Sequence, residues 1–232
     1  MTSKNIAKMT LAAGAVALVA GKASAAVDTA AVDAAIKSLK TNDGGVERKT
    51  LNPIDDAVIA THTDAAGRKK LEKDLVDMLA SGVSRSAQDF ICRRLRVIGT
   101  DQAIKALTAL LTDEKTSSIA RFALSEIPGD VALDALRTAL PKVSAKLKPG
   151  FIGSLGVRRD KKSVAAIAKL MGDSDMMTAR AAAHSLGVIG SPEAGKALCA
   201  CAGKAPANIK VSVADACLLC ADQLLADGNK TA

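Results

Sequence analysis

Aromatic side chains are nearly absent from this chain of 232 residues, which has no Trp, no Tyr and only three Phe. Sugar-binding clefts and single-stranded nucleic-acid sites depend on aromatic platforms, on which each stacked base contributes about 1–3 kcal/mol. The scarcity argues against both kinds of site. The core must instead be made of Ala, Leu, Ile and Val, which suits closely packed helices.

Histidine is equally scarce, since only His62 and His184 occur and neither lies beside a plausible nucleophile. The segment from Ile152 to Gly156 lacks the first glycine of the hydrolase G-x-S-x-G pattern and falls inside an expected helix. His184 is expected to be a partly exposed structural residue. These absences predict a protein that is not an enzyme and that carries no cofactor.

Long hydrophobic runs are limited to one, from Met9 to Gly21, which is 13 residues long and too short to cross a bilayer comfortably. It follows Lys4 and Lys8 and precedes small residues, with a cleavage site at the Ala25/Ala26 junction, so residues 1–25 are predicted to be a signal peptide. An uncleaved N-terminal anchor is the alternative. No cysteine follows the run to accept lipid. We therefore expect a periplasmic or secreted protein without stable membrane insertion.

Charge of one sign is not concentrated anywhere, although the formal net charge is +8. Acids and bases alternate along most of the chain, whereas a nucleic-acid binder usually gathers its Lys and Arg on a face or in a block. The dense basic clusters are short: Arg68 to Lys70, Arg93 to Arg96, and Arg158 to Lys162. We expect no nucleic-acid partner.

Internal repeats are the strongest positive feature. The segment from Leu95 to Leu107 is identical to that from Leu186 to Leu198 at eight of thirteen positions without a gap. Two further copies begin at Leu124 and Leu155, which gives offsets of 29, 60 and 91 residues from the first. Each unit of about 30 residues contains two apolar stretches with helical spacing around a short polar break.

The break predicts a helix, a tight turn and a second helix. Gly99 and Gly190 can end the first helix in a left-handed conformation, and Pro192 fits the first position of the second helix, where its missing N–H costs nothing. Three residues in one alignment column can cap the second helix: Thr100, Asp160 and Ser191.

One helix pair cannot cover its own apolar face, so neighbouring pairs must stack. The predicted fold is all-α, a right-handed α-α superhelix of antiparallel helix pairs. Residues 26–51 form an N-terminal helix (27–39) and a polar loop (41–50), residues 52–228 the repeat domain, and residues 229–232 a frayed end. Within the repeat domain we expect further helices over 52–60, 67–79 and 209–226, the last acting as a cap.

The repeats resemble the exported HEAT-repeat proteins of bacteria related to the PBS-lyase HEAT-like class. The resemblance rests on Phe90 to Gly99, Ala120 to Pro128, Ser154 to Asp160 and Ala181 to Gly190, and covers about residues 52–228. It implies the solenoid fold and an interaction role, but no chemistry, because such proteins share a scaffold and differ in their partners.

Four cysteines near the C-terminus read C-x-C-x15-C-x2-C, which is close to a structural zinc spacing. Three of them, Cys201, Cys217 and Cys220, fall in alignment columns that other repeats fill with apolar residues, so buried free thiols are one interpretation. A disulfide from Cys199 or Cys201 to Cys217 or Cys220 is the second, because the two helices should be neighbours. Zinc is a third, disfavoured because Cys199 and Cys201 point in different directions on a helix.

The arginines Arg121, Arg158 and Arg159 are the candidate binding residues. Arg158 and Arg159 occupy a turn that is apolar or small in the other repeats, and a guanidinium pair there could recognise a carboxylate or phosphate. Alternatively, they bond carbonyls at a helix end or pair with an acid of the adjacent repeat. The leading hypothesis is a scaffold that binds a protein partner along its concave face or its edge of turns. The alternatives are a binder of anionic polymer or lipid headgroups and, less favoured, an accessory lyase or cofactor-handling protein.

Overall fold

A computed structural model describes residues 27–41 and 47–229, and within these ranges every regular element is a helix. The first half contains α1 (Thr29–Ser38), η1 (Leu39–Thr41), α2 (Arg48–Ala60), α3 (Ala65–Ala80), α4 (Arg85–Ile98), α5 (Asp101–Ala109) and α6 (Ser117–Leu124). The second half contains α7 (Asp130–Ala139), η2 (Leu140–Lys142), α8 (Lys148–Val157), η3 (Lys161–Ser163), α9 (Val164–Leu170), α10 (Met176–Ile189), α11 (Pro192–Ala202) and α12 (Ala207–Ala226). The predicted signal peptide, the middle of the polar loop and the last three residues lie outside the described residues.

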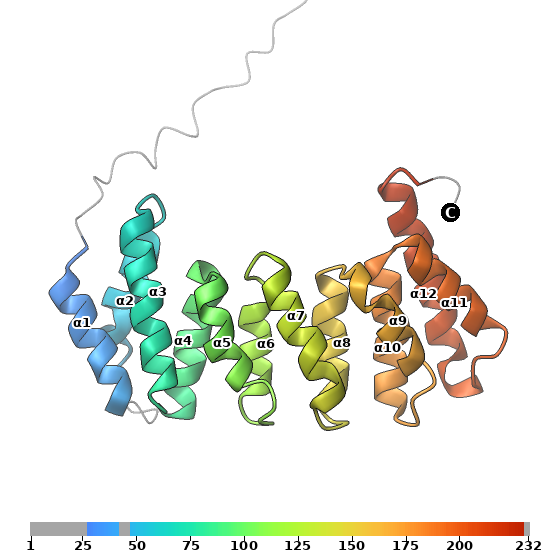
Figure 1. The fold of residues 1–232 in the computed structure, drawn as a ribbon, viewed down its shortest axis with the longest axis horizontal. Coiled ribbons are helices and arrows are strands. Elements are labelled where there is room, and N and C mark those ends of the chain that lie inside the picture. The colour runs from blue at the N-terminus through green and yellow to red at the C-terminus, as the bar shows by residue number, and fades with distance from the viewer. Residues whose placement is uncertain (1–26, 42–46, 230–232) are drawn as a thin grey trace, which may run out of the picture.

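The helices form a solenoid of two layers (Figure 1). Helices α2, α4, α6, α8, α10 and α12 pack side by side in one layer, and α3, α5, α7, α9 and α11 do so in the other. Each even-numbered helix is joined to the next odd-numbered one by a short turn at the upper edge in Figure 1. We call this the turn edge. The all-α solenoid of antiparallel helix pairs expected from the repeats is therefore confirmed.

The core runs continuously between the layers. It is built from buried Leu, Ile, Val and Ala, and its one fully buried aromatic side chain among the described residues is Phe151 of α8. Each repeat contributes residues with helical spacing, as Ile91, Leu95 and Ile98 do on α4. Because each pair buries its apolar face against its neighbours, stacking holds the fold together.

Small residues let the even-numbered helices α8, α10 and α12 approach closely. A Cβ atom added to Gly156 of α8 would lie 2.7 Å from the Ser185 Oγ of α10. One added to Gly187 of α10 would lie 2.9 Å from the Ala216 carbonyl oxygen of α12. Such distances are below ordinary van der Waals contact, so these two glycines set the spacing of the layer.

The expected helix bounds are confirmed at 27–39, 67–79 and 209–226 to within a few residues. The expected start at residue 52 was wrong, because α2 begins at Arg48 and includes Pro53 in its interior. The earlier start buries Leu51 beside Ile54 and Ala57 on the same face of the helix. That burial offsets the cost of a proline within a helix.

The turns match the predicted capping in part. Thr100 and Ser191 accept hydrogen bonds from the amides of Gln102 and Ala194, as expected. Asp160 does not cap a helix through its side chain, because its carboxylate is buried and accepts a hydrogen bond of 2.6 Å from the Arg137 guanidinium instead.

The two turn glycines differ from each other. Gly190 has φ +58° and ends α10 in the left-handed conformation, as predicted. For Gly99 the prediction was wrong, because its backbone is extended, with φ −65° and ψ 145°. Its lack of a side chain instead leaves room for Ile127, whose Cδ1 atom would lie 2.8 Å from an added Cβ.

Candidate functional site

Arg158 lies at the end of α8 and reaches across to the turn between α6 and α7. Its Nη1 atom donates to the carbonyl oxygens of Leu124 and Ile127 at 3.1 and 2.6 Å, and its Nη2 atom donates to that of Gly129 at 3.1 Å. The last carbonyls of a helix have no partner within the helix and carry the negative end of its dipole. Arg158 therefore caps α6 from the neighbouring repeat.

Arg159 makes the corresponding contact in the opposite direction. Its backbone has φ +48°, a left-handed conformation that is uncommon for a residue with a side chain. Its Nε atom donates to the Ile189 carbonyl oxygen at 3.1 Å, at the end of α10, and its guanidinium pairs with Asp227 just beyond α12. This hydrogen bond lowers the pKa of the Asp227 carboxyl below its ordinary value. The two adjacent arginines thus point into different repeats and do not form a joined pair.

Arg121 lies on α6 and is part-buried against α8. Its Nη1 atom donates to the Gly150 carbonyl oxygen at 2.7 Å, and its guanidinium lies 5.4 Å from the centre of the Phe151 ring. Burial lowers the pKa of this guanidinium. The structure therefore does not bring the three predicted arginines together at one site, and each joins two neighbouring repeats.

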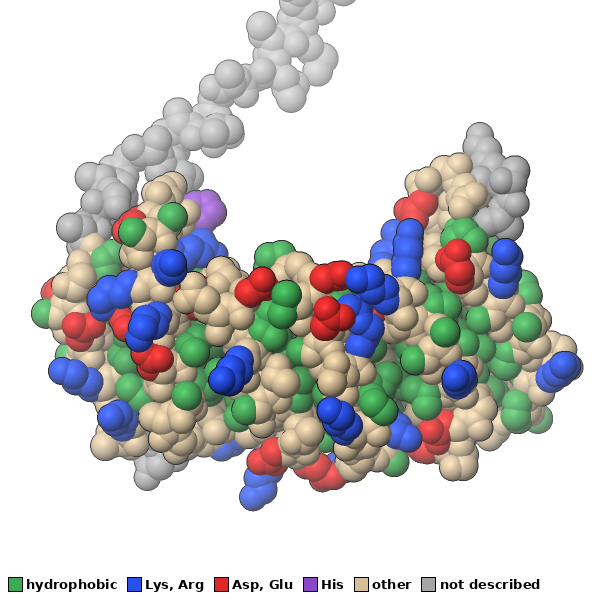
Figure 2. All heavy atoms as spheres, in the orientation of Figure 1, with side chains coloured by type: hydrophobic (Ala, Val, Ile, Leu, Met, Phe, Trp, Pro, Cys, Tyr) green, Lys and Arg blue, Asp and Glu red, His purple; other side chains and the backbone are tan. Residues whose placement is uncertain are grey.

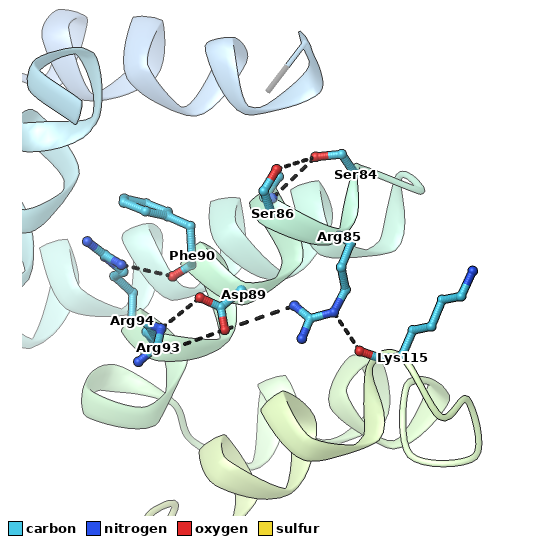
Figure 3. Close-up of polar contacts among 9 residues, drawn as sticks. Ser84, Arg85, Ser86, Asp89, Phe90, Arg93, Arg94 and Lys115 are labelled. Atoms are coloured by element: carbon cyan, nitrogen blue, oxygen red, sulfur yellow. Dashed lines mark hydrogen bonds and ion pairs between the residues drawn. The ribbon is translucent and has the colours of Figure 1, made fainter. Parts of the chain in front are cut away.

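Other basic side chains also join neighbouring repeats. Arg68 donates to the Val97 carbonyl oxygen at 2.6 Å near the end of α4, 29 positions away in the chain. In Figure 3, the Nε atom of Arg85 reaches the carbonyl of Lys115, 30 positions away, while Arg93 pairs with Asp89 on α4 itself. Contacts between neighbouring repeats that are separated by about one repeat length in sequence are Arg96–Glu126, Glu114–Lys146, Asp130–Lys162, Glu72–Thr100 and Arg180–Asn208. We call these and the arginine contacts above the inter-repeat connectors.

The turn edge also carries exposed apolar side chains that the sequence analysis did not identify. Ile59, Val97, Val157 and Leu225 each lie in the last turn of an even-numbered helix, with 73, 58, 72 and 61% of their surface exposed. We call these four residues the apolar row. Two of the four share an alignment column, because Val97 and Val157 are separated by the repeat offset of 60.

The middle of the turn edge is hollow and charged. Figure 2 shows the upper edge dipping between the α2–α3 turn and the end of α12, with acidic and basic side chains side by side on its floor. Ion pairs between α7 and the α8–α9 turn include Lys162 with Asp130 and Arg137 with Asp160, and Arg137 also pairs with Asp134 on α7. The hollow thus presents paired charges next to apolar side chains.

The C-terminal cysteines lie on the facing helices α11 and α12. The structure holds all four as free thiols: Cys220 is buried, Cys201 and Cys217 are half-buried, and Cys199 is exposed. Cys199, Cys217 and Cys220 line a groove of about 620 Å³ at this end of the solenoid. A second groove, of about 340 Å³, lies at the other end between α1, α3 and the α2–α3 turn. Both occur where the stack has no further neighbour.

Comparison with known proteins agrees with this geometry in the second half of the chain. Residues 133–216 match the family model for HEAT repeats. This segment is similar to HEAT repeats. The matched segment covers α8 to α11, together with part of α7 and the first half of α12, and the similarity agrees with the solenoid of helix pairs there.

Solved structures similar to the chain are also helical. One is human deoxyhypusine hydroxylase in complex with glycerol, at 17% identity, with 84% of this chain and 96% of that chain covered and a TM-score of 0.45. Another is an engineered protein, at 19% identity, with 81% and 97% covered and a TM-score of 0.44. No curated protein matches the sequence of this chain.

Both histidines lie on the surface of the solenoid. His184 is exposed on α10, as expected, and His62 is exposed in the α2–α3 turn. Within residues 27–41 and 47–229, no three His, Cys, Asp or Glu side chains are grouped so that they could hold a metal ion. The same residues include no helix that is both long and apolar enough to span a membrane. Ser154, from the segment that resembles a hydrolase pattern, is buried inside α8.

Proposed function

We propose that this chain is a non-enzymatic HEAT-repeat scaffold that binds a protein partner along its turn edge, in the periplasm or outside the cell. Export rests on the basic, apolar and small-residue pattern of residues 1–25. The interaction role rests on the apolar row. The family match covers only residues 133–216 and supports the scaffold alone.

The apolar row is the observation that carries the proposal. Single exposed apolar side chains are normal on a protein surface. Four at the same place in four helices, each more than half exposed, are instead typical of an interaction surface, where apolar anchors are surrounded by polar groups. Glu126 and the charges of the central hollow supply such a polar surrounding.

The inter-repeat connectors make this surface rigid before a partner arrives. Arg68, Arg158 and Arg159 each bond a carbonyl at the turn edge from an adjacent repeat. A surface that is already ordered loses less conformational entropy on binding. In this proposal Arg121, Arg158 and Arg159 do not contact the partner, although the sequence predicted a binding role for them. They hold in place the helices that carry the apolar row.

The test is affinity capture from the envelope fraction with the wild-type chain beside Val97→Glu/Val157→Glu. Placing two carboxylates in the apolar row should weaken partner capture at least roughly tenfold, since two lost apolar anchors cost about 1 kcal/mol or more each. Val211→Glu is the matched control, because Val211 is 72% exposed but lies near the start of α12, at the end of the helix opposite the turn edge.

An identified protein that is retained by wild type and Val211→Glu and lost from the double variant would support the proposal. A partner list that is unchanged by the double variant would contradict the assignment of the row. Retention on heparin that falls steeply between low and moderate salt would favour the alternative of an anionic polymer or lipid headgroup. A bound chromophore or metal in the purified protein would favour the cofactor-handling alternative.

A further inference from the structure

The groove at the C-terminal end of the solenoid brings cysteine thiols from two helices to one accessible surface. It is lined by α11 and α12, the last helix of the stack, and residues Lys196, Cys199, Cys217, Cys220 and Leu225 are part of that lining. Its volume of about 620 Å³ opens to solvent, and Cys199 is exposed there. A small dissolved reactant can therefore reach these thiols.

The register of α11 against α12 determines which two cysteines face each other across the groove. A Cβ atom on Gly195 of α11 would lie 3.5 Å from the Cys220 Sγ of α12, so these two residues face each other. The helices run antiparallel, and one turn further along brings Cys199 opposite Cys217. Burial and then the neighbouring Cys199 thiol raise the pKa of the Cys217 thiol, in agreement with this register, and both residues line the groove.

The remaining cysteines are placed differently. Cys220 is 1% exposed, and its thiol points to the Ser191 carbonyl oxygen at 3.8 Å. Cys201 is two residues from Cys199 on α11, which turns it about 200° around the helix axis and toward the core. Cys92 lies on α4, several repeats away, and is fully buried.

We propose that Cys199 and Cys217 are a reversible redox pair, which forms a disulfide between α11 and α12 by exchange with glutathione disulfide or another small disulfide. This goes beyond the scaffold role, because it adds a modification site that is independent of any partner.

The reaction balances as a thiol–disulfide exchange. The Cys199 thiolate attacks one sulfur of the small disulfide, a mixed disulfide forms, and the first small thiol leaves. The Cys217 thiolate then attacks the Cys199 Sγ and releases the second small thiol. The two cysteines lose two electrons and two protons in total, and the small disulfide gains both.

The order of attack follows from exposure. Cys199 is exposed and meets the incoming disulfide first. Burial raises the pKa of the Cys217 thiol, so a smaller fraction of this thiol is ionised at neutral pH. Its proximity to Cys199 offsets this disadvantage in the second, intramolecular step. The product ties the last helix of the stack to α11 and encloses residues 200–216 in a covalent loop.

The test incubates the purified reduced protein with glutathione disulfide, blocks free thiols, and maps the peptides without reduction. Trypsin gives peptide 197–204, which holds Cys199 and Cys201, and peptide 211–230, which holds Cys217 and Cys220. We expect these two peptides to be joined with the loss of two hydrogen atoms. Because each peptide holds two cysteines, single variants identify the pair.

Cys199→Ser and Cys217→Ser should each abolish the joined peptide, and Cys201→Ser and Cys220→Ser should each retain it. The folded state of each variant is checked by helical circular dichroism. The proposal would be overturned by a joined peptide that persists in Cys199→Ser but is lost in Cys201→Ser. It would equally be overturned if wild type gave only glutathione adducts and no link between the two peptides.

Discussion

At the scale of single residues, position on the solenoid decides what an arginine does. Arg158 caps α6 from the next repeat, Arg159 joins the ends of α10 and α12, and Arg121 stacks on Phe151. The three arginines stand out in the sequence, and a capping role for Arg158 and Arg159 is one of two roles that the repeat pattern allows. The sequence does not distinguish these roles, because most of the acceptors are backbone carbonyls, which have no sequence signature.

Arg158→Ala should lower the free energy of unfolding by about 1–3 kcal/mol, because it leaves carbonyls of the α6–α7 turn without donors. Arg158→Lys should recover only part of this loss, since one ammonium group cannot span the same set of acceptors. Urea denaturation measures the change, and Lys105→Ala, at an exposed position of α5, is the control. Equal midpoints for Arg158→Ala and wild type would contradict the capping role.

Cys92 should be unreactive in the folded protein. Burial on α4 raises the pKa of its thiol to about 12, so almost none is ionised at neutral pH, and the thiolate is the reactive form. Mass spectrometry after brief treatment with iodoacetamide should find label at Cys199 and none at Cys92, whereas urea-unfolded protein should be labelled at both. Label at Cys92 in the absence of urea would show that the core at α4 opens readily.

At the scale of elements, small residues determine how closely the helices of one layer stack. The helices over 67–79 and 209–226 could be predicted because their apolar spacing defines them locally. The start of α2 could not, since it depends on where Leu51 packs in three dimensions. The close approach of α10 to α12 was also beyond local pattern, because a glycine in a helix does not reveal what lies opposite it.

Gly187→Ala should destabilise the protein, although alanine is the better helix former by about 1 kcal/mol. The new methyl group would meet the Ala216 backbone of α12 and push the two helices apart, at a cost of about 1–3 kcal/mol. Gly153→Ala on α8 is the matched control, because an added Cβ there meets nothing within 4 Å, and it should stabilise the protein. Thermal or urea unfolding would contradict the packing argument if both variants shifted in the same direction.

At the scale of the whole molecule, recurrence determines both the core and the surface. Four copies at offsets of up to 91 residues were sufficient to predict the solenoid, because each repeated apolar column must be buried against a neighbour. Two residues of the apolar row, Val97 and Val157, also share an alignment column, but whether a repeated apolar residue is buried or exposed cannot be read from recurrence alone. The ion-pair partners among the inter-repeat connectors could not be assigned from the sequence for a related reason. They lie about one repeat away in the chain, and only the stacked structure brings them together.

Several of these charge pairs predict a loss of stability in acid. The pKa of Glu114 is lowered by Lys146, that of Asp130 by Lys162, and that of Asp227 by Arg159. Because the folded pKa is the lower one, each pair contributes stability above the ordinary values of 4.5 for Glu and 3.8 for Asp. This contribution disappears as the pH falls through the folded pKa.

The urea midpoint should therefore be level from about pH 7 to about pH 5 and should fall below about pH 4.5. The decrease assigned to these pairs should be small, because the groups are exposed and screened by water and salt. Glu114→Gln/Asp130→Asn/Asp227→Asn should have a lower midpoint at neutral pH and a flatter decline in acid, since the variant has no carboxylates left to protonate at these places. A parallel decline in wild type and variant would mean that other carboxylates, and not the connectors between repeats, control the acid stability of the solenoid.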